Sequence, residues 1–119
     1  MTELEFTGEY VVPGKTPYRS YQQHISRYVF AGEFIKDKIV LDVACGTGYG
    51  TKYLSTRSTK RVVGIDKSVD AINYAQKEYT KGEGPHFVRA DATNLPFPSA
   101  CFDFIVSFET IEHLEDQGK

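Results

Sequence analysis

Residues 39–50 read Ile-Val-Leu-Asp-Val-Ala-Cys-Gly-Thr-Gly-Tyr-Gly, and this stretch decides how the fold is interpreted. Its first five residues form a short apolar run of the kind found in buried strands. Its glycines allow a tight turn that can lie against a ligand, and a helix is predicted from residue 49. The stretch therefore predicts a strand, a glycine-rich loop and a helix N-terminus, which together form a potential binding site.

Helix and strand patterns alternate through the rest of the chain. Strands are predicted at residues 39–43, 61–65, 86–90 and 102–108. Helices are predicted at about residues 16–36, 49–56, 68–79 and from residue 109 onwards. This alternation predicts an α/β domain with a parallel sheet and right-handed crossovers.

Composition and charge limit the possible function classes. A chain of 119 residues is long enough for one domain, in which residues 1–36 are expected to form an N-terminal arm and helix. The net charge of −2 offers no basic field for nucleic acid, and no apolar run is long enough for a membrane span. The acidic start is unlike a secretory signal, and the two cysteines, Cys45 and Cys101, are too few for a disulfide scaffold. We therefore expect a cytoplasmic protein with no nucleic-acid or membrane partner.

Acidic residues follow the second and third predicted strands. Asp66 lies 20 residues beyond Gly46, and a carboxylate there can accept hydrogen bonds from both hydroxyls of a ribose. Asp91 is suited to a second polar contact, such as an adenine amino group. Ligands of open α/β sheets bind beyond the carboxyl ends of the strands. The three strand ends together therefore predict a ligand of adenosine type.

The spacing of the glycines indicates which kind of adenosine ligand the site would bind. In the dinucleotide pattern G-x-G-x-x-G, a third glycine would occupy position 51, which is Thr51. Asp42 would also lie unfavourably close to a pyrophosphate, whereas a ligand with a cationic ammonium and sulfonium would tolerate it. Residues 14–16 match the last three residues of the phosphate-binding P-loop pattern. A P-loop is nevertheless excluded, because the first glycine of that pattern would fall on Glu9.

Two stretches of the chain resemble the motifs of one enzyme family. Residues 40–50 resemble motif I of class I S-adenosylmethionine-dependent methyltransferases, although the family usually has glycine where this chain has Ala44. Residues 89–97 and 102–106 are similar to later motifs of the small-molecule branch called type 11. The resemblance covers roughly residues 38–114. It implies a Rossmann-like, open, mainly parallel sheet of about four strands in the order 3-2-1-4, with helices on both faces, and S-adenosylmethionine as cofactor.

The resemblance also implies a set of cofactor contacts. Gly46 and Gly48 would cradle the methionine portion of the cofactor. Asp66 would bind the ribose, and Asp91 with the backbone of Ala92 would bind the adenine. The complete set of expected cofactor-binding residues is Asp42, Ala44, Gly46, Gly48, Asp66, Lys67, Asp91, Ala92 and Ser107.

The implied activity is methyl transfer to a small-molecule acceptor. Type 11 enzymes move the methyl group from a sulfonium to an O, N or C atom by in-line displacement, so the protein mainly aligns the two centres and excludes water. The complete fold has three strands more than this chain, and most residues that select the acceptor would lie in them. The alternative is therefore a cofactor-binding module, or a truncated remnant, that binds S-adenosylmethionine without turnover.

Glu109, Glu112 and His113 share one face of the last predicted helix. A similar arrangement holds a divalent metal in some O-methyltransferases, which makes these residues candidate metal ligands. The preferred alternative is a pair of acidic residues stabilised at a helix N-terminus beside a histidine that packs, and no metal is then expected.

The first predicted helix carries Tyr18, Tyr21, His24 and Tyr28 at helical spacing. N-terminal helices often cover the cofactor in this family, so these side chains would form a lid, and the alternative is that they belong to the core. His24 and His113 are the candidates for a general base, whose need depends on the acceptor.

The fourth predicted strand would be an edge of the sheet. Its expected faces are Phe102, Phe104, Val106 and Phe108 on one side, and Ile105 and Ser107 on the other. An apolar edge strand invites pairing with another chain. We therefore expect a homodimer through this strand, and the alternative is a monomer in which residues 1–16 fold back over the edge.

Overall fold

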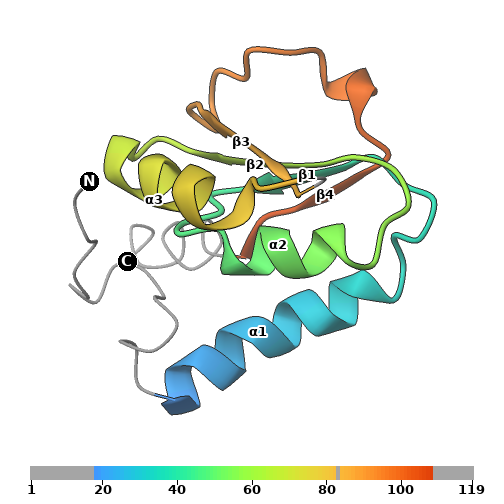
Figure 1. Ribbon diagram of the computed structural model, residues 1–119. Coiled ribbons are helices and arrows are strands. Elements are labelled where there is room, and N and C mark those ends of the chain that lie inside the picture. Colours follow the sequence, from blue (N-terminus) through green and yellow to red (C-terminus); the bar gives the residue numbers. More distant parts are fainter. Residues whose placement is uncertain (1–17, 83, 109–119) are drawn as a thin grey trace, which may run out of the picture.

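A four-stranded parallel sheet forms the centre of the molecule (Figure 1). The computed structural model describes residues 18–82 and 84–108, with side chains from Ile25 onwards except that of Ser99. The strands are β1 (Val40–Val43), β2 (Val62–Asp66), β3 (His86–Arg89) and β4 (Phe104–Val106). Their order is β3-β2-β1-β4, and all three pairings are parallel. The predicted strand order and parallel pairing are therefore confirmed.

Three helices pack on one face of this sheet (Figure 1). They are α1 (Tyr18–Gly32), α2 (Tyr49–Ser55) and α3 (Val69–Tyr79), and a short 3₁₀ turn spans Ser99–Cys101. Val40 of β1 and Val62 of β2 share a buried cluster with α1 and α2. Successive strand residues point to opposite faces, so this side of β1 also carries Asp42.

The other face of the sheet is covered by the connection between β3 and β4. Its half-buried side chains are Ala90, Leu95, Phe97 and Phe102, and they pack against Leu41, Val43, Val63 and Ile65. The sequence predicted helices on both faces. Within the described residues, this irregular segment takes the place of an α-helix on the second face.

Local hydrogen bonds fix the start of α3 and the end of α1. Ser68 precedes α3, and its hydroxyl accepts a hydrogen bond from the Ala71 N–H at 3.2 Å, which confirms the predicted N-cap. The predicted first helix extended to about residue 36, but α1 ends at Gly32. There the N–H groups of Glu33 and Phe34 bond to carbonyls three residues earlier, which tightens the chain into a turn.

The fourth strand is shorter than predicted, and one of its residues faces the other way. Phe104 packs in the helix-side cluster as expected. Phe102 instead packs against Phe97 on the opposite face, with ring centroids 5.0 Å apart. The chain bends just before β4, because the Ile39 N–H donates to the Asp103 carboxylate at 2.9 Å and the Asp103 N–H donates to the Ile39 carbonyl at 2.8 Å. The strict alternation predicted over residues 102–108 was therefore wrong at Phe102.

β4 is an edge of the sheet, because among the described residues its only strand partner is β1. Ile105 is 50% exposed at this edge. The edge position predicted for this strand is thus confirmed for the described residues.

Candidate cofactor-binding site

The carboxyl ends of β1, β2 and β3 lie at the same edge of the sheet, because the strands are parallel. The chain leaves β1 into a tight loop over residues 44–48. This loop is held by two backbone bonds, from the Cys45 N–H to the Ile65 carbonyl at 2.8 Å and from the Gly48 N–H to the Cys45 carbonyl at 3.2 Å. α2 starts directly after it, so its first N–H groups point toward the same edge.

Asp66 connects this loop to the end of β2. One carboxylate oxygen accepts from the Gly46 N–H and the other accepts from the Ser68 N–H, both at 2.9 Å. The side chain is only 7% exposed. Each carboxylate oxygen has a second lone pair, so Asp66 retains acceptor capacity while it holds the loop. The sequence placed Gly46 and Asp66 in one site, and the structure joins them by a direct hydrogen bond.

The glycines of the loop are required by backbone geometry and by close packing. Gly46 has φ of 59° and Gly48 has φ of 91°, both in the left-handed region that favours glycine. A Cβ on Gly48 would lie 2.8 Å from Ala75 of α3 and from the Phe87 ring of β3. The loop is therefore pressed onto α3 and β3, which leaves little freedom in its shape.

Ala44 has φ of 58°, a left-handed conformation that is unfavourable for a residue with a Cβ. This is the position at which the resemblance expected glycine. We predict that Ala44→Gly raises the free energy of unfolding by about 1 kcal/mol, because glycine adopts this conformation without strain. Urea denaturation measures the effect. Ala71→Gly inside α3 is the matched control and should destabilise, and equal losses in both variants would contradict the argument.

Asp42 is fully buried beneath the loop, on the helix side of β1. Its two carboxyl oxygens accept from the Thr51 hydroxyl at 2.7 Å and from the Tyr28 hydroxyl at 3.2 Å. Burial raises the pKa of Asp42 to about 7, although both hydroxyl bonds act in the opposite direction. The structure thus encloses this carboxyl among protein groups, and a direct contact with a ligand stays a prediction.

The raised pKa of Asp42 predicts a pH-dependent stability. The unfolded chain loses this proton near pH 4 and the folded chain near pH 7, so the folded state binds more protons in between. Asp42 should therefore lower the free energy of unfolding by about 3 kcal/mol as the pH rises from 5 to 8. Denaturant titrations over this pH range should show this loss of stability in the wild type. In Asp42→Asn, the free energy of unfolding should change less with pH. Parallel profiles would contradict the assignment.

Asp91 follows β3 on the surface of the same edge. One carboxylate oxygen accepts from the Thr93 N–H at 2.9 Å and from the Thr93 hydroxyl at 2.8 Å. The backbone bond is the largest of the effects that hold the pKa of Asp91 below its usual value, and Lys67 adds to them. Ala92 is exposed beside it, and Ser107 is partly buried just after β4. The four predicted contacts Lys67, Asp91, Ala92 and Ser107 thus all directly follow a strand or lie within three residues of its end.

Comparison with known proteins places this arrangement in a family. The methyltransferase domain family Methyltransf_11 matches residues 41–119. The chain belongs to the class I S-adenosylmethionine-dependent methyltransferases. It is 29% identical, over 98% of its length, to a probable S-adenosylmethionine-dependent methyltransferase of Mycolicibacterium smegmatis, of which it covers 44%. It is 39% identical, over 66% of its length, to phosphoethanolamine N-methyltransferase 1 of Arabidopsis thaliana, of which it covers 16%.

A solved structure also matches the fold of this methyltransferase domain. The PH0226 protein of Pyrococcus horikoshii OT3 superposes with a TM-score of 0.65 and 30% identity, over 81% of this chain and 45% of that one. The chain therefore spans less than half the length of each of these three proteins.

Among the residues predicted for a lid, a general base or a metal site, the structure describes the side chain of Tyr28 alone. Tyr28 is fully buried in the cluster between α1, α2 and the sheet, so the core interpretation is the correct one for its side chain. The other residues of the predicted lid and of the candidate base and metal sites lie outside the described side chains; they are Tyr18, Tyr21, His24, Glu109, Glu112 and His113. Among the residues that are described, no cluster of three His, Cys, Asp or Glu could hold a metal ion. Cys45 and Cys101 are both free thiols.

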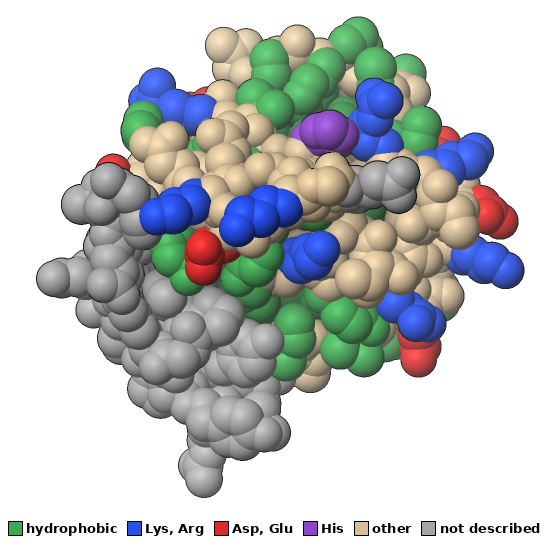
Figure 2. All heavy atoms as spheres, in the orientation of Figure 1, with side chains coloured by type: hydrophobic (Ala, Val, Ile, Leu, Met, Phe, Trp, Pro, Cys, Tyr) green, Lys and Arg blue, Asp and Glu red, His purple; other side chains and the backbone are tan. Residues whose placement is uncertain are grey.

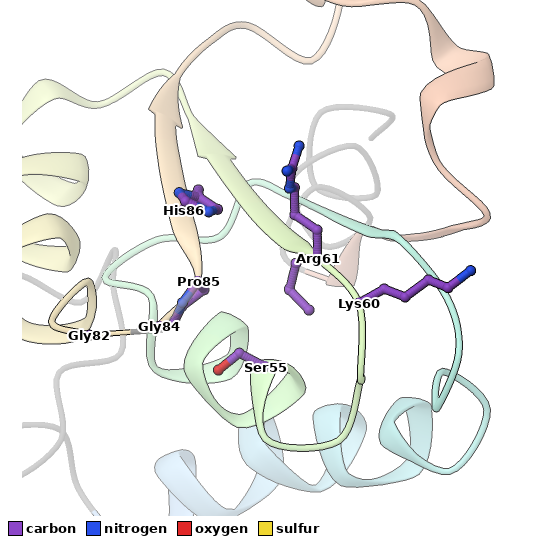
Figure 3. Close-up of a pocket in the computed structure, with 8 residues that line it drawn as sticks. Ser55, Lys60, Arg61, Gly82, Gly84, Pro85 and His86 are labelled. Carbon is purple, nitrogen blue, oxygen red and sulfur yellow. The ribbon is translucent and has the colours of Figure 1, made fainter.

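A pocket of about 260 Å³ lies at the opposite end of the sheet, at the amino ends of β2 and β3 (Figure 3). Its lining residues are Ser55, Lys60, Arg61, Val62, Gly82, Gly84, Pro85 and His86. The side chains of Lys60 and Arg61 extend in different directions in Figure 3, so they do not converge on a common ligand. This pocket is therefore separate from the strand ends that carry the predicted cofactor contacts.

Sequence reasoning missed two residues that support the site. In the sequence, Thr51 stands out only because it replaces a glycine of the dinucleotide pattern, yet its hydroxyl donates to Asp42. Thr93 fixes the Asp91 carboxylate and was not singled out. The Asp-x-Thr spacing of residues 91–93 is a local signal for such a turn. No local signal exists for the bond between Thr51 and Asp42, because it depends on how α2 packs on β1.

Proposed function

We propose that this chain is the cofactor-binding part of a methyltransferase that binds S-adenosylmethionine at the carboxyl ends of β1, β2 and β3. The observation that carries the proposal is the bond from the Gly46 N–H to Asp66, which joins the glycine loop to the acidic strand end. The site also fits the charge of the cofactor, because the carboxylate of Asp66 is buried beside the loop and the carboxyl of Asp42 is buried beneath it. A ligand with a sulfonium and an ammonium is attracted to such a site.

The proposal assigns a part of the cofactor to each segment. Gly46 and Gly48 approach the methionine portion through their backbone, while Ala44 borders it. The carboxylate of Asp66 accepts from the ribose hydroxyls. Asp91, with the backbone of Ala92, binds the adenine. Lys67 lies beside the adenosine, and Ser107 lies at the end of β4 near the methionine portion.

The proposed reaction is methyl transfer to a small-molecule acceptor. The bound cofactor supplies a methyl group that is already activated on a sulfonium. The chain's own contribution is to hold the cofactor in one orientation and to exclude water from it. Similarity to the Arabidopsis phosphoethanolamine N-methyltransferase supports an acceptor of small-molecule type. The competing proposal, a module that binds the cofactor without turnover, is favoured by the short length relative to these proteins.

A methyl-transfer assay separates the two proposals. The purified chain is incubated with methyl-labelled S-adenosylmethionine and a panel of amine, hydroxyl and carboxylate acceptors. Labelled product that disappears in Asp66→Ala supports the enzyme. Cofactor binding without product for any acceptor supports the binding module.

We further propose a homodimer in which β4 or the adjoining segment is buried against a second copy. The half-exposed Ile105 on an edge strand supports this, because neither proline nor lysine interrupts β4. Sedimentation at micromolar concentration should give a dimer. A monomer would contradict the proposal and would favour coverage of the edge by residues 1–16.

We propose one domain over residues 1–119, in the cytoplasm, with no nucleic-acid or membrane partner. On the face shown in Figure 2, Lys and Arg side chains do not form one continuous patch, since polar and apolar groups and a few acidic ones lie between them, which supports the absence of a nucleic-acid surface there. Within the described residues, no helix is both long and apolar enough to span a bilayer. The sequence pI of about 5.9 gives further support, since nucleic-acid-binding domains are typically basic.

A further inference from the structure

Asp42 lies on β1, just before the loop of residues 44–48, and bonds to two helices. Its partner Tyr28 lies on α1, and its partner Thr51 lies on α2. The Tyr28 ring also packs against Gly50, where an added Cβ would lie 2.3 Å from the ring. It makes edge-to-face contacts with Tyr49 and Phe108, at centroid distances of 5.7 and 5.1 Å. The loop and the start of α2 therefore rest on a buried polar group.

The surroundings of Asp42 favour a proton on its carboxyl when no ligand is bound. The titratable groups that act on it are the phenol of Tyr28 from α1, which bonds to it, and the charge of Asp66 at the end of β2. The buried thiol of Cys45 lies beside Gly64, which pairs with Asp42 in the sheet, and the Tyr49 ring packs against that of Tyr28. Burial raises the pKa of Asp42 to about 7, and the nearby Asp66 charge raises it further. None of the groups that act on this pKa in the described part of the chain is cationic.

We infer that Asp42, held by the hydroxyls of Tyr28 and Thr51, couples the binding of a cationic cofactor to the release of one proton from its carboxyl. The inference rests on the proposed function, because it requires the methionine portion of S-adenosylmethionine at the Gly46–Gly48 end of the site. A positive charge brought there favours the ionised carboxyl, because the interior between them is poorly polarisable. The proton passes to the buffer, and the two hydroxyls then both donate to the carboxylate.

Tyr28 and Thr51 are positioning residues in this scheme. Each donates to one carboxyl oxygen, and a donor stabilises the ionised form of an acid. Removal of either hydroxyl should therefore move the titration of Asp42, and with it the pH midpoint of binding, to higher pH. The shorter bond, from Thr51, predicts the larger shift for Thr51→Val than for Tyr28→Phe.

Calorimetric titration with S-adenosylmethionine tests the inference. For the wild type, the affinity should fall about five- to tenfold from pH 7.5 to pH 6, because the protonated fraction of Asp42 rises over this range. Titrations at pH 7 in buffers of different ionisation enthalpy should show roughly half a proton released per ligand bound. Asp42→Asn should lose both effects. The ligand's own titration is the same for both proteins, so the comparison cancels it.

Two further variants keep the test decisive if Asp42→Asn does not fold. Tyr28→Phe and Thr51→Val should move the pH midpoint upwards, whereas Tyr53→Phe on α2 should leave it unchanged. Equal proton release in the wild type and Asp42→Asn, or unmoved midpoints in the two hydroxyl variants, would overturn the inference while cofactor binding stands. Absence of binding at every pH would overturn the inference and the proposed function together.

Discussion

Asp66→Ala is expected to weaken the binding of S-adenosylmethionine by roughly 10- to 150-fold. The variant removes a charged acceptor worth about 1.5–3 kcal/mol from the site of the ribose hydroxyls. It also leaves the Gly46 and Ser68 N–H groups without their carboxylate partner, so the loop loses one of its supports. The dissociation constant, measured by calorimetry on folded protein, gives the effect.

The control for this prediction is Asp70→Ala. Asp70 is an exposed acid in the first turn of α3, four residues beyond Asp66, and lies off the strand end. Its removal takes away the same formal charge and should change the affinity less than threefold. If Asp66→Ala bound as tightly as the wild type, the assignment of the ribose to the end of β2 would be wrong.

Gly50→Ala is expected to lower the free energy of unfolding by about 3 kcal/mol. Its Cβ would lie within 2.3–2.5 Å of three ring carbons of Tyr28, which is fully buried and tied to Asp42 by its hydroxyl. Such overpacking forces the ring or α2 to move. Urea denaturation measures the stability, and cofactor affinity should fall with it because the loop precedes this residue.

Gly82→Ala is the matched control, since its Cβ would meet nothing within 4 Å although its φ is 68°. Backbone strain in that variant should lower the free energy of unfolding by only about 1 kcal/mol. Combining Gly50→Ala with Tyr28→Leu should cost less than the two single changes added together, because the smaller side chain removes the clash. An additive double variant, or a Gly50→Ala protein as stable as the wild type, would contradict this packing.

The elements of the fold were predictable where their signals are local. Residues 39–43 form an apolar run that ends in glycines, and Ser68 is a capping residue ahead of an apolar stripe. Both lie where they were predicted, within one or two residues. The strand order came from the family resemblance rather than from any local pattern, and the pairings of β1 with β2 and β4 confirm it.

The errors and omissions arose where contacts join distant parts of the chain. Phe102 faces away from the predicted side because Asp103 bonds to Ile39, 64 residues earlier. The partners of Asp42 come from α1 and α2, so its burial could not be read from the motif that contains it. Local periodicity carries no information on such tertiary hydrogen bonds.

Calorimetric titration of the purified chain with S-adenosylmethionine and, separately, with NAD tests most directly whether the site binds S-adenosylmethionine. We expect saturable one-site binding of S-adenosylmethionine and no detectable binding of NAD, because Asp42 is unfavourable beside a pyrophosphate and Thr51 replaces the third glycine of the dinucleotide pattern. Tight binding of NAD with no response to S-adenosylmethionine would contradict this expectation.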